Sequence, residues 1–321
     1  MKFVLIALLV AVLGILLIEL SLRLFWGFGN PPLYVADDQI GYLLAPNQRL
    51  RRMGNRIEIN QYSMRSPATT IERPATTLRV LLLGDSLVNG NWWTDQSQTL
   101  SALIAQPLRT EARPEGYQSV EVLNASANSW GPRNQLAYLE RFGTFEATVV
   151  VLVLNTDDLF GTQPSPLQVG RDRSYPSRKP PAAIAEFLNR YQKQPPIPGL
   201  AEIQNEGGDR VGMNLAAIQA IQQQARAAQS EFILVLSPLK REVLPPGPRD
   251  YEQVARQRLA ELAIAAQIRY LDLLATYQQQ SEPESLYRDH IHLSPAGNAL
   301  VSCLVVEQIQ AALDSSAKPL P

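Results

Sequence analysis

Five short apolar runs, separated from one another by helix-like segments, constrain the fold of this chain more than any other feature. The run ATVVVLVLN, for example, is apolar at almost every position. A strand with two apolar faces is typical of the middle of a parallel sheet, where helices cover both sides. The five runs occupy Arg79–Leu83, 119–126, 147–155, 231–237 and 268–273. Their alternation with helices predicts an α/β fold, a three-layer α/β/α sandwich around a parallel five-stranded sheet with right-handed connections.

The segments between the runs have helical composition, with one exception. Helices are expected at 100–110, 132–142, 214–229, 251–267 and 295 to about 313. Pro132 stands near the start of the second helix, and Ser294 can cap the last one, whose first residue is Pro295. The exception is a Pro-rich insertion at about 160–210, which we expect to be an excursion over the surface.

The first 28 residues are almost entirely apolar and predict a transmembrane helix. Apolar residues run unbroken from Phe3 to Ile18, and Glu19 and Arg23 interrupt a second apolar piece that ends at Phe28. With this second piece the segment reaches the ~17–25 residues that span a bilayer. A cleaved signal peptide is the alternative, but no small-x-small cleavage site follows the apolar run. We expect a retained anchor and a body outside the cytoplasm, because large domains translocate largely regardless of charge.

These features divide the chain into three predicted parts. Residues 1–28 are the predicted anchor, 29–76 a membrane-proximal extension and linker, and 77–321 the α/β domain with its insertion. Within the extension, RIEINQYSMRS has the alternation of a short strand, and SPATTIERPATT has the composition of a linker.

Charge and rare residues limit the possible functions. The chain has 29 Lys and Arg against 30 Asp and Glu, so no basic surface for nucleic acid is expected. Its one cysteine, Cys303, cannot form an internal disulfide and is predicted to be a small core residue. The 2 histidines both lie in RDHIHLSPAG, so any chemistry that needs imidazole depends on that stretch.

Polar residues follow the ends of the predicted strands. Ser86 follows the first strand in LRVLLLGDSLVNG, NASANSWGP follows the second, and NTDDLFG follows the third. In open parallel sheets, ligands bind outside the carboxyl ends of the strands, which share one edge. We therefore expect these loops, and the DHIH segment before the last helix, to meet at a single site.

The sequence GDSL at Gly84–Leu87, together with Asp289 and His292 in D-x-x-H spacing, resembles the SGNH (GDSL) hydrolase superfamily. The match in order and spacing runs from Leu78 to about Leu313, apart from the Pro-rich insertion, and it leaves out the N-terminal anchor. This resemblance implies a flavodoxin-like fold, esterase, lipase or carbohydrate O-acyl chemistry, and no metal or cofactor.

The same residues suit nucleophilic catalysis. A serine hydroxyl is a poor nucleophile unless a base takes its proton as it attacks. His292 occupies the family's histidine position, and Asp289 can accept a hydrogen bond from its imidazole and hold the required tautomer. Ser86, Asp289 and His292 are therefore the predicted catalytic residues. His290 is expected to be a surface histidine and Asp85 a structural turn residue.

The predicted oxyanion hole departs from the family pattern, which supplies a Ser N–H, a Gly N–H and an Asn side-chain amide. The first donor would be Ser86. The Gly position falls on Ser129, which tolerates fewer backbone conformations than glycine. The Asn position falls on Asp157, whose carboxylate would repel a developing oxyanion. Asn155, two residues earlier, lies on the same side of an extended segment and can supply the missing amide.

The sequence thus predicts a membrane-anchored serine esterase that hydrolyses O-acyl esters of a small molecule, a glycan or a lipid. Trp92 and Trp93 could line an acyl or sugar pocket, although core packing is an equal alternative. A carbohydrate O-acyltransferase would use the same three residues. A non-catalytic glycan-binding or scaffold protein is a further alternative, which Ser129 and Asp157 favour. Nothing in the sequence indicates a protein partner.

Overall fold

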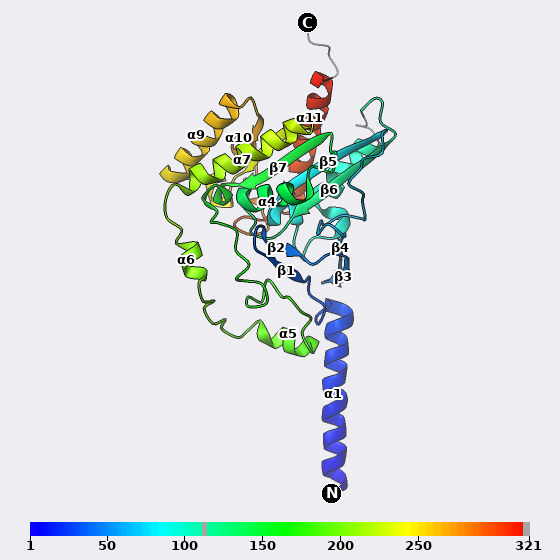
Figure 1. The fold of residues 1–321 in the computed structure, drawn as a ribbon. Helices are drawn as coiled ribbons and strands as arrows, with labels where there is room; N and C mark the ends of the chain where they lie inside the picture. Colours follow the sequence, from blue (N-terminus) through cyan, green and yellow to red (C-terminus); the bar gives the residue numbers. More distant parts are fainter. Residues whose placement is uncertain (111–113, 317–321) are drawn as a thin grey trace.

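A computed structural model describes residues 1–110 and 114–316 and contains the parallel sheet (Figure 1). Its strands are β5 (Thr77–Gly84), β6 (Ser119–Ser126), β7 (Val149–Asn155), β8 (Glu231–Ser237) and β9 (Arg269–Asp272). They pair in parallel in the order β6-β5-β7-β8-β9. The central strand β7 is buried along its whole length, as its two apolar faces require. The prediction of an α/β fold with five parallel strands is confirmed.

Helices cover both faces of the sheet and complete the three layers. One face carries α3 (Leu100–Arg109) and α11 (Pro295–Ser316), and the other carries α4 (Pro132–Phe142), α7 (Arg210–Ala227) and α9 (Asp250–Ala265). Each face of the sheet packs in its own hydrophobic core, and successive side chains of β5 point into opposite cores. Leu82 packs on the α3 side and Leu83 on the α4 side. The helix expected at 214–229 begins earlier, because the Asp209 side chain accepts the Gly212 N–H and caps it.

The remaining short elements lie at the ends of the strands and helices. They are α2 (Ser86–Asn89), η1 (Gln96–Gln98), η2 (Thr156–Phe160), α8 (Lys240–Val243), α10 (Leu274–Gln278) and η3 (Pro283–Leu286).

The segment 29–76 contains two antiparallel hairpins below the sheet in Figure 1. They pair β1 (Tyr34–Asp37) with β2 (Gly41–Leu44) and β3 (Gln48–Arg52) with β4 (Asn55–Ile59). The sequence pattern predicted a single short strand here. Strands of four or five residues are too short to show a clear alternation, and this explains why the others were not predicted.

The helix α1 (Lys2–Trp26) projects away from the body, and none of its residues is buried. Its last turns contact α5 (Ala183–Asn189), a helix of the Pro-rich insertion, which also contains α6 (Leu200–Gln204). The Glu19 carboxylate accepts the N–H groups of Ala183 and Ile184, both at 2.9 Å, at the start of α5. The insertion is therefore ordered against the end of α1.

Two helices in the described part of the chain, α1 and α11, are long and apolar enough to cross a membrane. Buried residues of α11, such as Val305 and Ile309, pack in the core against the sheet, so this helix is part of the α/β domain. The prediction that Cys303 is a core residue is wrong. Cys303 is exposed, because α11 turns its neighbours Val301 and Ser302 inward instead.

Candidate active site

A tight turn at the end of β5 positions Ser86. Gly84 is required there, because a Cβ atom would lie 2.3 Å from Val88 Cγ2 and 3.0 Å from the Val153 carbonyl oxygen. Asp85 caps the short helix α2 by accepting the Leu87 N–H at 2.8 Å. This is the structural role expected of Asp85. Ser86 begins α2 at the carboxyl edge of the sheet.

The segment before α11 brings the imidazole of His292 to Ser86. His292 Nε2 lies 3.0 Å from Ser86 Oγ, and His292 Nδ1 lies 2.8 Å from Asp289 Oδ2. Asp289 Oδ1 also accepts the N–H groups of Ile291 and His292. Partial burial raises the pKa of Asp289, but these backbone hydrogen bonds and the imidazole outweigh it and leave the pKa lowered. Asp289 is thus held as a carboxylate beside the ring.

Aromatic and cationic side chains surround His292. The Trp93 ring packs edge-on against the imidazole with centroids 4.9 Å apart, and the Arg288 guanidinium lies 5.0 Å from the centre of the Trp93 ring. The side chain of His290 is 84 % exposed and makes no contact with Ser86. The structure therefore brings the side chain of His292, and not that of His290, into hydrogen-bond contact with Ser86.

A buried arginine from the segment 29–76 holds the loop after Ser86. The Arg65 guanidinium donates to the carbonyl oxygens of Asn89, Asn91 and Thr94. Arg65 is 1 % exposed, and burial lowers its pKa to about 10, so the side chain is still charged at neutral pH. A charged donor that binds three carbonyl groups fixes the path of the loop more firmly than neutral contacts would.

Ser129 has the backbone conformation that glycine would adopt at this position. Its φ is 59°, in the left-handed region. Its N–H has no hydrogen-bond acceptor within residues 1–110 and 114–316. Tyr175 of the insertion donates its hydroxyl to Ser129 Oγ at 3.0 Å, and Tyr42 of the β1–β2 hairpin donates to the Asn128 carbonyl oxygen at 2.6 Å. Two tyrosines from outside the sheet domain thus support this loop.

Asn155, at the end of β7, lies in a buried cluster of acids. Its Nδ2 donates to Asp85 Oδ2 at 2.9 Å and to Asp158 Oδ2 at 3.0 Å, and its Oδ1 accepts the Asp157 N–H. Both amide hydrogens are therefore in use. Burial raises the pKa of Asp158 well above its ordinary value and also raises the pKa of Asp85, since the two acids lie close together away from water.

Asp157 is exposed to the cavity in front of Ser86, unlike its neighbours in η2. Its carboxylate makes no hydrogen bond or ion pair with other described residues. Partial burial is the main cause that raises its pKa. Within the same described part of the chain, no cluster of three His, Cys, Asp or Glu side chains has a geometry that could hold a metal ion.

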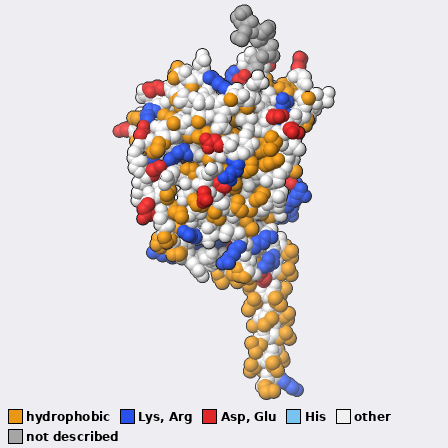
Figure 2. Space-filling model, viewed as in Figure 1, with side chains coloured by type: hydrophobic (Ala, Val, Ile, Leu, Met, Phe, Trp, Pro, Cys, Tyr) orange, Lys and Arg blue, Asp and Glu red, His pale blue; other side chains and the backbone are white. Residues whose placement is uncertain are grey.

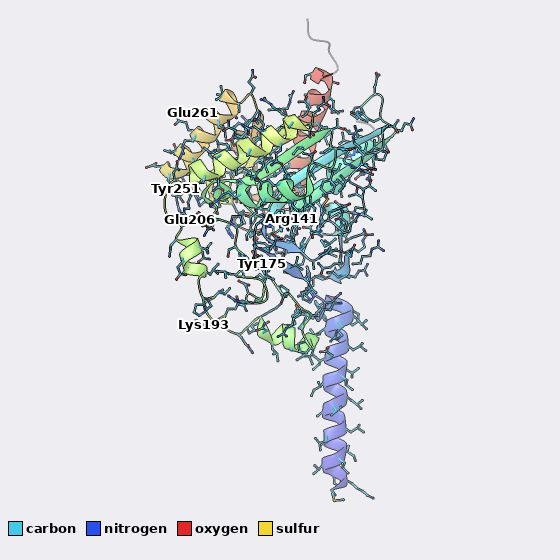
Figure 3. All side chains as sticks on the ribbon, viewed as in Figure 1. Arg141, Tyr175, Lys193, Glu206, Tyr251 and Glu261 are labelled. Carbon is cyan, nitrogen blue, oxygen red and sulfur yellow. The ribbon has the colours of Figure 1, made fainter. Side chains whose placement is uncertain are left out.

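A cavity of about 1820 Å³ lies in front of these residues, and the insertion and the hairpins form most of its walls. Figure 3 shows Tyr175 between the insertion and the hairpins, on the side of the sheet domain toward α1. A second, much smaller hollow of about 10 Å³ lies behind Ser86 and His292 against Trp93 and Leu293. The site therefore has a wide side and a side with room for little more than one small group.

Sequence patterns did not identify Arg65, Tyr42 or Tyr175 as site residues. All three come from segments outside the strand–helix alternation, and each reaches the site through a contact distant in sequence. A tyrosine within a Pro-rich surface segment was the only available signal for Tyr175. Of the two tryptophans, Trp93 lies at the site, whereas Trp92 packs against the core on the wall of the large cavity.

Comparison with known proteins gives one clear match in sequence and several in fold. The model of the GDSL-like lipase/acylhydrolase family matches residues 82–300. No curated protein matches. The acetyl xylan esterase AlAXEase is 15 % identical over 72 % of this chain and 99 % of its own, with a TM-score of 0.48. A lipase/acylhydrolase from Enterococcus faecalis is 17 % identical over 73 % of this chain and 95 % of its own, with a TM-score of 0.46.

A third solved structure, the acetylxylan esterase Axe2 from Geobacillus stearothermophilus, is 14 % identical over 75 % of this chain and 96 % of its own, with a TM-score of 0.49. At such identities the likeness says nothing about substrate.

Proposed function

The chain belongs to the GDSL-like lipase/acylhydrolase family and is a serine ester hydrolase, and we propose that Ser86 is its nucleophile, His292 its general base and Asp289 the residue that orients the base. The carrying observation is the continuous set of contacts from Ser86 Oγ through both ring nitrogens of His292 to Asp289, at 3.0 and 2.8 Å. With Nδ1–H donated to Asp289, the free electron pair of Nε2 faces the serine hydroxyl.

The proposed reaction has two displacements. Ser86 Oγ attacks the ester carbonyl carbon while its proton passes to His292 Nε2. The tetrahedral intermediate collapses as the C–O bond to the alcohol breaks, and His292 gives the proton to the leaving alcohol. Water then attacks the acyl-enzyme, losing its proton to His292. The bond to Ser86 breaks, the acid leaves, and His292 returns the proton to Ser86.

The proposed oxyanion hole consists of the N–H groups of Ser86 and Ser129. The unpaired Ser129 N–H and its left-handed backbone support this role, because preorganised donors stabilise developing charge without rearrangement. Asn155 and Asp157 are the candidates for a third donor. The Asn155 amide must release Asp85 or Asp158 to serve, and Asp157 can donate only when it is protonated.

The shape of the site supports an O-acyl ester with a small acyl group and a bulky alcohol part. The small hollow beside Trp93 suits a short acyl group, and the large cavity suits a glycan or lipid alcohol. Transfer of the acyl group to an acceptor hydroxyl is a second candidate reaction, favoured by a cavity wide enough for an acceptor. Because the chain belongs to an enzyme family, we do not pursue the alternative of a non-catalytic scaffold.

We further propose that α1 is a retained membrane anchor with the body outside the cytoplasm. Removing α1 as a signal peptide would take Glu19 from the start of α5 and leave two N–H groups of that helix without their acceptor. The full-length protein should stay in the membrane pellet after a salt wash. Its recovery in soluble form with a processed N-terminus would contradict the proposal.

Covalent labelling tests the catalytic assignment. A fluorophosphonate should label Ser86 alone, and Ser86→Ala should abolish both labelling and ester hydrolysis while the fold is kept. Asp289→Asn should cost less turnover than His292→Ala, because it disturbs the base without removing it. Labelling that persists in Ser86→Ala would overturn the assignment. Supplying an acyl donor with and without glycan acceptors separates hydrolysis from transfer.

A further inference from the structure

The helix α5 and the turn after it present two large apolar side chains that are mostly exposed, although one side of the Tyr191 ring packs edge-on against Phe187 at 5.4 Å. Leu188 is 54 % exposed and Tyr191, just after the helix, is 76 % exposed. Figure 1 shows α5 at the lower edge of the body, crosswise to α1 and beside its upper end. A short helix that presents apolar and cationic side chains in this orientation suits the plane of a membrane interface.

The contacts between α1 and α5 set the depth of this surface. The apolar stretch Phe3–Ile18 is roughly 24 Å long as a helix, somewhat less than the ~30 Å hydrocarbon core. The ~20 residues that span the core therefore end within about one turn after Glu19, the first acidic residue of the segment, so Glu19 lies near the edge of the hydrocarbon. Since Glu19 binds the first N–H groups of α5, that helix lies at the level of the lipid headgroups.

Further contacts make this arrangement rigid. The Glu186 carboxylate in α5 accepts the Gly29 N–H at 2.6 Å and pairs with the Arg52 side chain, which is 3 % exposed. The Phe28 ring packs edge-on against Phe187 at 5.6 Å. Arg190 lies over Phe28 at 4.8 Å and over Trp92, on the cavity wall, at 5.7 Å. The cavity wall, α5 and the end of α1 are one packed unit.

The cavity extends to this same edge. Its lining includes Arg52, Glu186, Asn189, Arg190 and Lys193, all of which are in α5, beside it or in contact with it. In Figure 3, Lys193 lies at the lower edge of the body near the level of α5. An ester that reaches Ser86 from this side would enter directly from the headgroup layer.

Basic residues surround the cavity entrance. Arg178, Lys179 and Lys193 are exposed and form no ion pair with the described acidic residues. Figure 2 shows Lys and Arg side chains gathered where the body meets α1. Such residues are attracted to anionic headgroups, and they would hold the α5 surface against a membrane.

We propose that the α5 surface of Leu188 and Tyr191 inserts into the headgroup layer beside α1, and that the cavity takes its ester from the membrane. The substrate class is an O-acylated amphiphile, with its alcohol part anchored in the bilayer and its acyl ester within reach of Ser86. This inference rests on the proposed esterase function for its substrate, but not for the position of α5.

A depth measurement tests the position of α5 without reference to activity. The full chain carrying Cys303→Ser is given a single cysteine, as Tyr191→Cys or as Ile264→Cys, labelled with a fluorophore and reconstituted into vesicles. Ile264, on α9, is 79 % exposed, which matches Tyr191. Brominated lipids should quench the label at position 191 and leave the label at 264 unquenched. Equal quenching at the two positions would overturn the proposal.

Turnover tests the substrate class. Leu188→Ser combined with Tyr191→Ser should lower hydrolysis of a long-chain alcohol acetate in anionic vesicles at least about tenfold, because the loss of burial of even one large apolar side chain corresponds to that factor. Hydrolysis of water-soluble p-nitrophenyl acetate should not change. The matched control, Val254→Ser with Ile264→Ser on α9, should leave both rates unchanged.

These outcomes distinguish the two proposals. An unmodified chain that hydrolyses neither ester contradicts the esterase function, whereas the quenching result stands by itself. Equal turnover of the vesicle ester by the α5 variant and the control variant overturns the membrane-borne substrate class. Loss of both activities in the α5 variant alone would mean that α5 supports the fold of the site instead, which also overturns it.

Discussion

Replacing Asn155 by alanine separates a structural from a catalytic role for this amide. Its two hydrogens bind Asp85 at 2.9 Å and Asp158 at 3.0 Å in a buried cluster. A hydrogen bond to a charged group contributes about 1.5–3 kcal/mol, and one to a neutral group about 0.5–1.5 kcal/mol. Because the two carboxyl groups bind the same Nδ2 in a buried cluster, and like charges this close together disfavour joint ionisation, we count one bond of each kind. The change also removes the neutral hydrogen bond from the Asp157 N–H to Asn155 Oδ1. Asn155→Ala should therefore lower the free energy of unfolding by about 2.5–6 kcal/mol.

If the Asn155 amide has a structural role, Asn155→Ala should lower kcat only slightly while it lowers stability clearly. We expect the folded fraction of Asn155→Ala to lose less than about tenfold in kcat, whereas loss of an oxyanion donor typically costs ~10²–10³. Urea unfolding followed by tryptophan fluorescence gives the first quantity, and p-nitrophenyl acetate hydrolysis the second. The control is Asp157→Asn, which removes an unpaired carboxylate and should leave stability unchanged and kcat unchanged or higher. Unaltered stability with a hundredfold loss of kcat in Asn155→Ala would refute this reasoning.

Five other substitutions test separate parts of the site. His292→Ala should lose nearly all turnover and His290→Ala less than about twofold, since the latter side chain is 84 % exposed; a larger effect at 290 would mean that the base is misassigned. Tyr175→Phe removes one neutral hydrogen bond to Ser129, in the loop of the proposed oxyanion hole, and should lower kcat about two- to tenfold, with KM nearly unchanged. Burial raises the pKa of Asp158, so its carboxyl group contributes stability that is fully present below the pKa of the unfolded state and is lost as pH rises through the pKa of the folded state. The free energy of unfolding of Asp158→Asn, measured by urea titrations, should lack this fall between acid and neutral pH. Trp93→Ala should enlarge the small hollow and raise the rate on butyryl relative to acetyl esters, and an unchanged ratio would place the acyl group elsewhere.

The strands, the helices on both faces and the convergence of the loops at one edge could be predicted from sequence. Their signals are local, because an apolar run such as 147–155 carries its own burial pattern, and the edge follows from the parallel order. The approach of His292 to Ser86 was expected from the resemblance to the SGNH hydrolases, and the structure brings Nε2 and Oγ within 3.0 Å.

The support of the site could not be predicted in this way. Arg65, Tyr42 and Tyr175 act through contacts with residues distant in the chain, and no periodicity marks such contacts. Cys303 illustrates the opposite error. An apolar neighbourhood suggested burial, but only the packing of α11 decides which side of the helix faces the sheet. The hydrogen bonds that occupy the Asn155 amide likewise depend on how β5 and β7 are placed side by side.

The position of Arg65 limits which fragments of this enzyme can be used to build chimaeric proteins. The loop after Ser86 is tied to a residue that precedes the first strand of the sheet. A fragment that begins at residue 77 would retain every motif residue, yet the carbonyl groups of Asn89 and Asn91 would lose their common donor. The smallest portable catalytic unit is therefore longer than the motif-bearing domain. A chimaera that transplants the sheet domain alone onto another anchor should bind an active-site probe poorly while it still folds.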